Sequence, residues 1–165
     1  MLNNECLPHL IKNNVFTDDR GFFSRIDIPD YFGEVKQSNY VINNQKGMIR
    51  GLHWQRSPKN EKKIVRVIKG KIFDVLVDIK KSSNSYGEVF NFILEENSSS
   101  LYVPEGFAHG YQTLTSKSEI LYLHSEKYYP DLSKTLFYNC LDIKWPLKIS
   151  KISKKDLLGI KLNDL

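Results

Sequence analysis

Two residues that could carry chemistry, Arg50 and His53, lie three positions apart in an apolar, strand-like run over residues 47–55. An arginine binds anions and an imidazole accepts a proton near neutral pH, so together they would form an anionic-substrate site with a base. Side chains alternate faces along a regular strand, which would point the two apart. A bulge at Gly51 would bring both to one face. The alternative is a surface arginine and a core histidine.

Further polar residues lie within or beside apolar segments: Lys63, Asp74, His109, Tyr122 and Asp156. Asp74 is the most unusual, because a carboxyl in the middle of an apolar strand needs partners if it is buried. The structural alternatives are a snorkelling surface lysine for Lys63, a core ring for Tyr122 and a structural histidine for His109. Asp156 follows a serine at capping-box spacing, so it could simply cap a terminal helix.

Length and composition are those of an ordinary globular chain. A chain of 165 residues with 41% hydrophobic residues fits one domain, 1–165, with a sizeable core. The net charge of +5 is scattered, and the nearest basic run, at 59–63, is interrupted by Glu61. This modest, scattered positive charge favours a small anionic ligand over nucleic acid. Cys6 and Cys140 match no metal or redox spacing, which indicates a reducing, cytoplasmic location.

Other classes of protein and site find little support in the sequence. We expect no signal peptide, and no stretch reaches the ~18 apolar residues of a membrane span. A metal site on a small barrel commonly uses a His-x-His pair, whereas Trp54 and Gln55 follow His53, and Gly110 follows His109. Neither cysteine lies in a nucleophile motif, and no glycine-rich phosphate loop is present.

The elements that must position these residues are mostly short strands. A strand pair is predicted around the turn at 17–21, and a short helical turn at 28–32. Further strands are predicted at 35–42, 62–69, 71–79, 89–95, 100–103 and 119–124, with a possible hairpin through Lys69 and Gly70. This pattern is typical of an all-β barrel or jelly roll, here with a small C-terminal helical segment. A small barrel can hold one small ligand inside.

Taken in order, the motifs from Phe16 to Asp156 resemble one family, the dTDP-4-dehydrorhamnose 3,5-epimerases, which are cupin-fold enzymes of nucleotide-sugar metabolism. Any one motif is weak, but their order and spacing are specific. The matching segments are 18–23 (DDRGFF), 50–55 (RGLHWQ), 63–67 (KIVRV), 74–78 (DVLVD), 103–111 (VPEGFAHGY), 128–130 (YYP), 143–146 (IKWP) and 152–156 (ISKKD). The resemblance implies a single cupin-type jelly-roll domain with short N-terminal strands.

The resemblance also implies a substrate class, a nucleoside diphosphate 4-keto-6-deoxy sugar, and a role for each matching residue. His53 would be the base, paired with Asp156, while Tyr122 would be the acid on the opposite face of the sugar and Lys63 would stabilise the enolate. The implied substrate-binding residues are Arg20, Arg50, Phe16, Phe22, Gln37, Asn39, Gln55, His109, Asp74 and Tyr128. An acid and a base suffice for epimerisation, so no cofactor or metal is expected. The family also implies a homodimer with exchanged strands.

Departures from the family pattern leave the substrate open. Arg25 stands near an expected glutamate, Val41 follows the Gln37–Asn39 motif, and Ser133 and Lys134 replace another acidic position. The nucleotide, the sugar and the carbon that is epimerised (C3, C5 or both) therefore stay undetermined. Two alternatives also stay open: a 3,4-ketoisomerase on the same fold, and a non-catalytic barrel that binds sugar nucleotides.

Overall fold

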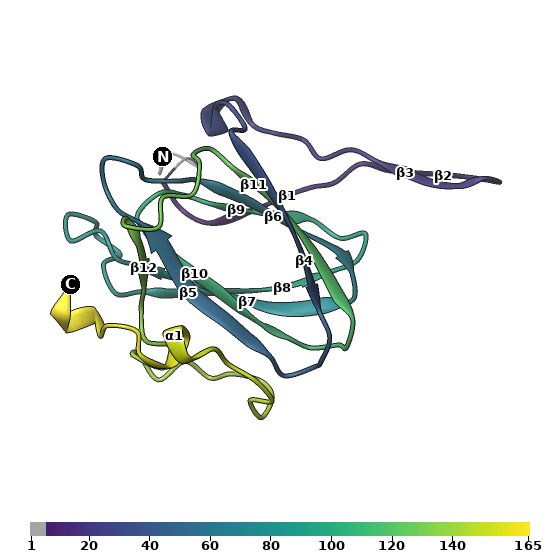
Figure 1. The fold of residues 1–165 in the computed structure, drawn as a ribbon. Coiled ribbons are helices and arrows are strands. Elements are labelled where there is room, and N and C mark those ends of the chain that lie inside the picture. The colour runs from purple at the N-terminus through teal and green to yellow at the C-terminus, as the bar shows by residue number, and fades with distance from the viewer. Residues whose placement is uncertain (1–5) are drawn as a thin grey trace.

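Two facing five-stranded antiparallel sheets build the protein, and the computed structural model describes residues 6–165 (Figure 1). The first sheet has the order β1-β9-β6-β11-β4 and the second the order β12-β5-β10-β7-β8, which confirms the predicted jelly-roll architecture. The strands are β1 (His9–Ile11), β4 (Gln37–Asn43), β5 (Ile49–Gln55), β6 (Lys63–Lys69), β7 (Lys71–Asp78), β8 (Val89–Glu95), β9 (Ser100–Val103), β10 (Phe107–Thr113), β11 (Ser118–His124) and β12 (Ser133–Thr135).

Alternation along the central strands builds the core between the sheets. On β7, Ile72 and Leu76 face inward and meet Val65 and Val67 of β6 in one buried cluster. The opposite face of β7, including Val75, belongs to a second cluster that the C-terminal part of the chain covers. The two faces of β7 therefore pack in different clusters, and Asp74 lies on the inward one with Ile72 and Leu76.

The predicted hairpin between residues 62–69 and 71–79 is wrong. β6 pairs with β11 and β9, whereas β7 pairs with β10 and β8 in the other sheet. Gly70, with φ of +83°, turns the chain from one sheet to the other. Because the apolar faces of both strands belong to the same inner cluster, the strands lie face to face rather than side by side.

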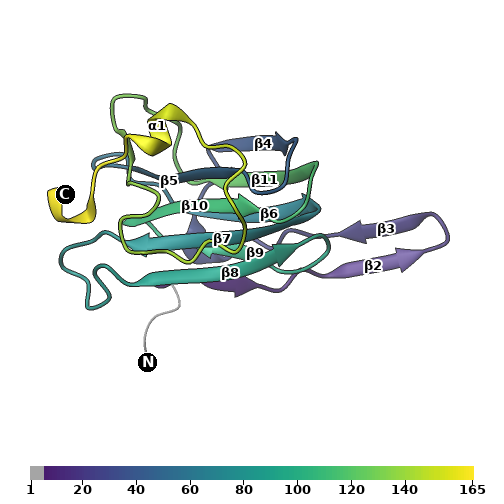
Figure 2. The same ribbon diagram turned by 90° about the horizontal axis from the view of Figure 1, so that it is seen from below.

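A separate hairpin of β2 (Val15–Asp18) and β3 (Gly21–Ser24) projects away from the barrel as an arm (Figures 1 and 2). The strand pair was predicted, but its departure from the barrel was not. Phe16, Phe22 and Phe23 on this arm are 53%, 57% and 60% exposed. Its base is held by the buried Arg66, which donates to the Ser24 hydroxyl at 2.6 Å.

Helical structure is confined to short pieces. A 3-10 turn, η1 (Asp30–Phe32), forms where a turn was predicted, and α1 (Lys154–Leu157) and η2 (Leu162–Asp164) lie near the C-terminus. The hydroxyl of Ser153 caps α1 by accepting from the backbone N–H of Asp156 at 3.1 Å, as the capping-box spacing predicted. Among residues 6–165 no helix is long and apolar enough to cross a membrane.

Candidate active site

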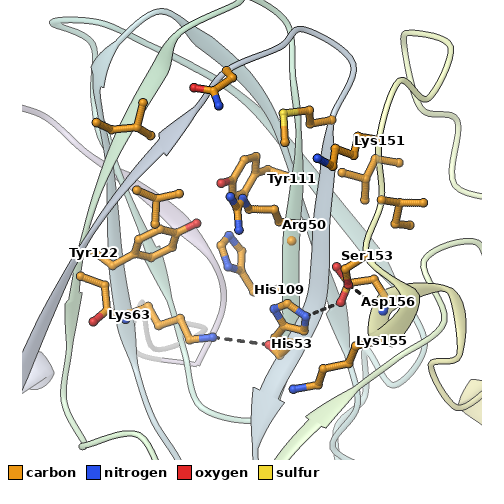
Figure 3. Close-up of a pocket in the computed structure, with 18 of the residues that line it drawn as sticks. Arg50, His53, Lys63, His109, Tyr111, Tyr122, Lys151, Ser153, Lys155 and Asp156 are labelled. Atoms are coloured by element: carbon orange, nitrogen blue, oxygen red, sulfur yellow. Dashed lines mark hydrogen bonds and ion pairs between the residues drawn. The ribbon is translucent and has the colours of Figure 1, made fainter.

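A cavity of about 530 Å³ opens between the two sheets, and residues from three parts of the chain line it (Figure 3). The first sheet contributes Lys63 and Tyr122, and the second contributes Arg50, His53 and His109. The segment around α1 adds its own residues, Asp156 among them. The fold therefore brings the candidate catalytic residues, which lie far apart in sequence, into one site.

The bulge predicted at Gly51 is confirmed. Arg50 pairs with Tyr111 of β10, and His53 pairs with His109. Three residue steps on β5 therefore lie opposite two on β10, so β5 carries an extra residue there. Gly51 has φ of +122°, and a Cβ on it would lie 2.5 Å from the Cα of Gly110. Glycine is thus required at this crossing. As a result, Arg50 and His53 line the same cavity.

His53 and Asp156 form a close pair at the cavity wall. His53 Nε2 lies 2.6 Å from Asp156 Oδ1, while Asp156 Oδ2 accepts from the Gly51 backbone N–H at 3.4 Å. Burial opposes ionisation of this carboxyl, but the hydrogen bond and charge of His53, with the Ser153 hydroxyl, hold the pKa of Asp156 below its ordinary value. The carboxylate therefore fixes the proton on Nε2 and leaves Nδ1 as the nitrogen that can accept one.

His109 and Asp74 form a second pair deeper between the sheets. His109 Nε2 lies 2.8 Å from Asp74 Oδ1, and the two side chains are 4% and 0% exposed. Burial raises the pKa of Asp74 despite the opposing influence of His109 and Lys63. Within residues 6–165, no group of three or more His, Cys, Asp or Glu side chains is placed to hold a metal ion.

Tyr122 enters the cavity from β11, in the sheet that faces β5 (Figure 3). Burial, together with the nearby Tyr111 and Asp74, raises the pKa of Tyr122 well above its ordinary value. Burial likewise raises the pKa of Tyr111 to about 12. At neutral pH the Tyr122 hydroxyl therefore keeps its proton and can act as a donor.

Lys63 is a cavity residue, so its interpretation as a snorkelling surface lysine is wrong. The side chain is 8% exposed, and its Nζ lies 3.1 Å from Glu61 Oε1 and 3.4 Å from the backbone carbonyl of His53. Burial opposes ionisation of Glu61, but Lys63 and His124 lower its pKa to about 2. Lys63 is thus an ammonium ion held against a carboxylate inside the site.

The mouth of the cavity is cationic. Arg50 Nε donates to Asn43 Oδ1 at 2.9 Å, and the Tyr111 hydroxyl donates to the same oxygen at 3.1 Å. Lys151 and Lys155, from the segment that carries α1, line the other side (Figure 3). Three cations around one opening suit an anionic group such as a diphosphate.

Several predicted substrate-binding residues lie outside this cavity. Arg20, Phe16 and Phe22 are exposed on the β2–β3 arm, and Tyr128 is 56% exposed. Gln55 is buried, and its side-chain amide donates to the backbone carbonyls of residues 59 and 127 at 2.6 and 3.0 Å. Asn39 lines the cavity, whereas Gln37 reaches it through a hydrogen bond to Asn39 and Asp74 through its pair with His109.

Sequence reasoning missed further polar residues of the site: Asn43, Glu61, Tyr111, His124, Lys151 and Lys155. Some signals were available. Glu61 is the acidic residue that interrupts the lysines at 59–63, and His124 lies two positions beyond Tyr122 on one strand face. Nothing local pairs them, because the two residues lie 63 positions apart in sequence.

Comparisons with known proteins point to one enzyme family. The family model for dTDP-4-dehydrorhamnose 3,5-epimerase matches residues 8–164. Epimerases of that name from Neisseria gonorrhoeae and Shigella flexneri are 38% and 35% identical over 91% and 94% of this chain, which spans 48% and 91% of their lengths. A Legionella pneumophila 3,5-epimerase solved with dTDP-4-keto-L-rhamnose is 32% identical, with a TM-score of 0.87 over 94% of this chain and 88% of its own. The chain therefore belongs to the dTDP-4-dehydrorhamnose 3,5-epimerase family of nucleotide-sugar isomerases.

Proposed function

We propose that this protein epimerises a dTDP-4-keto-6-deoxy sugar at C3, C5 or both, through an enolate. The observation that carries the proposal is the arrangement of His53, paired with Asp156 at 2.6 Å, and Tyr122 on opposite sheets of one cavity. Inversion of a carbon requires that a proton leave one face and return to the other. A base and an acid on facing walls meet that requirement without a cofactor.

Proton removal falls to His53. A hydrogen next to the C4 ketone is acidic once the resulting enolate is stabilised, and Nδ1 of His53 is the nitrogen left free to take it. The imidazolium that forms is stabilised by the ionised Asp156, whose pKa is held low by His53 and Ser153 despite burial. The carboxylate thus acts by orienting the ring and balancing its charge.

Enolate stabilisation falls to Lys63. Its ammonium is buried beside the cavity, where an ionic interaction is stronger than in water. Tyr122 then returns a proton to the opposite face, since its raised pKa keeps the hydroxyl protonated until the carbanion needs it. The aromatic hydroxyl also interacts with Tyr111, which keeps it directed into the site.

Substrate binding is assigned to the cationic mouth. Arg50, Lys151 and Lys155 lie where a diphosphate could bridge them, with the sugar directed inward. The Legionella relative binds dTDP-4-keto-L-rhamnose, which favours thymidine as the base here as well. The departures at Val41 and Arg25 lie outside the catalytic pair, so they bear on substrate choice rather than on proton transfer.

The test is incubation of the enzyme with dTDP-4-keto-6-deoxy-D-glucose in deuterated water, followed by NMR. We expect deuterium at C3, C5 or both, with inversion, and the position of the label identifies the carbon. Tyr122→Phe should keep exchange at the carbon that His53 deprotonates but lose inversion by about 100-fold. Absence of exchange in the wild-type enzyme with this substrate and its CDP and GDP analogues would contradict the proposal. A product with its ketone at C3 would indicate the ketoisomerase instead.

We also propose that the enzyme is a homodimer in which each β2–β3 arm reaches the partner. Three phenylalanines more than half exposed on a projecting hairpin form an apolar surface that soluble monomers seldom leave uncovered. This arrangement would deliver Arg20, Phe16 and Phe22 to the partner's cavity, which explains why they lie far from their own. Replacing Phe22 with serine should shift the mass measured by light scattering toward the monomer and raise the substrate KM.

The proposal also covers the domain organisation and the cellular location of the protein. Residues 1–165 are taken as one epimerase domain, which the family match over 8–164 supports. A cytoplasmic location is supported by the free thiols of Cys6 and Cys140, since disulfides are rare in that compartment.

A further inference from the structure

Glu61, which is largely buried, and His124, which is buried, are titratable residues to which the proposed mechanism gives no role. Glu61 bridges two cations or potential cations, with Oε1 3.1 Å from Lys63 Nζ and Oε2 2.8 Å from His124 Nδ1. The side chains of Glu61 and His124 are 13% and 10% exposed. His124 also stacks on Tyr122, with the ring centroids 5.8 Å apart and the planes at 25°. These two residues thus contact both the enolate-stabilising lysine and the proposed acid.

A continuous series of hydrogen bonds leads to this pair from a fixed backbone group. The Tyr128 backbone N–H, which can only donate, lies 2.9 Å from Gln37 Oε1. That contact sets the orientation of the Gln37 amide, whose Nε2 donates to Asn39 Oδ1 at 2.9 Å. The Asn39 amide is set in turn, so its Nδ2 donates to His124 Nε2 at 3.1 Å.

The direction of these bonds determines the tautomer of His124. Because Nε2 accepts from Asn39, it carries no proton, and the ring proton must lie on Nδ1. Nδ1 then donates to Glu61, whose second oxygen accepts from Lys63. The groups that face His124 are Asn39 on β4, Glu61 just before β6, Lys63 at the start of β6, and Tyr122 on its own strand. The donors therefore point in one direction from the Tyr128 backbone N–H to the Glu61 carboxylate, which also accepts from the Lys63 ammonium on its other oxygen.

We propose that His124 and Glu61 are positioning residues for Lys63, in which a neutral His124 with its proton on Nδ1 orients the Glu61 carboxylate that holds the ammonium at the enolate. The proposal rests on the proposed function for the role of Lys63, but the tautomer follows from the hydrogen bonds alone. It also links the two ends of the site. Asn39 lines the cavity. A ligand group that turned the Asn39 amide would reverse the direction of its hydrogen bond to His124, and the change would pass through Glu61 to Lys63.

The tautomer is tested directly by long-range ¹H–¹⁵N NMR of the histidine side chains, with His124→Gln used to assign the signal. We expect neutral His124 with Nδ1 protonated at neutral pH. Asn39→Asp places an acceptor at Nε2, so the ring would lie between two carboxylates and should become doubly protonated. His9 is the internal control, because its Nδ1 lies 3.0 Å from the Leu7 carbonyl and it should keep Nδ1–H in both proteins.

The positioning role is tested by kinetics of matched variants. Glu61→Gln offers one acceptor oxygen to two donors, so kcat should fall about tenfold with KM within about twofold. Glu126→Gln is the control, because Glu126 pairs with Lys36 and Lys59 outside the cavity and should leave both constants unchanged. A glutamine at 124 can donate to Glu61 and accept from Asn39, so His124→Gln should keep kcat within about threefold, whereas His124→Leu should lose about tenfold.

These outcomes separate the inference from the proposed function. An Nε2–H tautomer or an imidazolium in the wild-type protein at neutral pH overturns the inference, whatever the enzyme catalyses. Equal kcat values for Glu61→Gln and Glu126→Gln also overturn it, as does equal loss in His124→Gln and His124→Leu. If wild-type enzyme epimerises no nucleotide sugar, the function fails, and the NMR result alone decides the orientation of the series.

Discussion

The protein contains two histidine–aspartate pairs of the same composition in opposite surroundings. In the pair His53–Asp156 the imidazole is 39% exposed and faces the cavity, and the pKa of the carboxyl is lowered. In the pair His109–Asp74 both side chains are buried, and burial raises the pKa of the carboxyl. The residue types are identical, so it is solvent access and hydrogen bonding that divide their roles.

The two carboxylates also differ in the number of their hydrogen-bond partners. Asp156 has three partners, since it accepts from His53 and Gly51 while its backbone N–H is capped by Ser153. Among residues 6–165, the Asp74 carboxyl hydrogen-bonds to His109 through Oδ1, and its Oδ2 is buried without a hydrogen bond. These contacts fit the proposal that the first pair changes protonation during the reaction. For the second pair they fit a supporting role at the floor of the site.

The largest contrast should come from removing each imidazole. His53→Ala removes the base, so we expect deuterium exchange and turnover to fall by about 10³–10⁴-fold with little loss of stability. His109→Ala leaves a buried carboxyl unpaired, so we expect a loss of about 3 kcal/mol in unfolding free energy and a drop in kcat of only about tenfold. Exchange rates and urea unfolding of both variants check this. Comparable losses of activity would remove the distinction between the pairs.

A smaller contrast should follow when each carboxylate becomes an amide. Asp156→Asn can no longer balance the imidazolium of His53, so kcat should fall about 100-fold. Asp74→Asn still offers an oxygen to His109 Nε2 and removes a buried ionisable group, so kcat should stay within about threefold. Steady-state kinetics at one pH compares them. An inverted order would show that the buried pair, not the exposed one, carries the chemistry.

The dependence of stability on pH should have opposite sign in the two amide variants. The lowered pKa of Asp156 contributes stability above its ordinary value of 3.8, and this is lost as pH falls through the lower folded value. The raised pKa of Asp74 contributes stability below 3.8 that is lost as pH rises through the folded value. Asp156→Asn should therefore lower the unfolding free energy more at pH ~7 than at pH ~3, whereas Asp74→Asn should lower it less at pH ~7 than at pH ~3. Urea denaturation at the two pH values measures both differences. Parallel slopes would contradict these shifts.

The smallest effect should come from the cap of α1. Ser153→Ala removes the hydrogen bond to the Asp156 backbone and should cost about 1 kcal/mol of stability, with kcat lowered about threefold. Ser98→Ala is a matched control, because that hydroxyl accepts from the Glu95 backbone N–H at 3.1 Å and neither residue lines the cavity. Thermal unfolding and kcat of the two variants compare them. A larger kcat loss in the control would show that the cap does not act through Asp156.

Features encoded within a few residues were predictable from the sequence. The strand pair around Gly21, the bulge at Gly51 and the cap at Ser153 each depend on local spacing or on one residue's conformational preference. The fold class followed because many short strands leave few architectures open. These predictions needed no knowledge of which distant strands pair.

Features that depend on distant pairing were not predictable in this way. The turn at Gly70 has hairpin chemistry, yet it crosses between sheets, because the partner of β6 is fixed by residues 118–124. Lys63 resembled a surface lysine until Glu61 and the cavity were placed around it. The contact between His53 and Asp156 spans 103 positions and entered only through the family resemblance. No local signal placed the β2–β3 arm outside the barrel.

The way in which the C-terminal segment is attached bears on how the enzyme loses activity when it is heated. Its backbone joins the rim of the barrel through Ser150 N–H to the Gly47 carbonyl and Ile49 N–H to the Lys151 carbonyl, both at 2.9 Å. Opening of this segment would withdraw Asp156 while both sheets keep their ladders, and such sub-global opening costs less than complete unfolding. Thermal inactivation would then precede melting of the sheets, and a protein that looks folded by circular dichroism would already lack the carboxylate that pairs with His53.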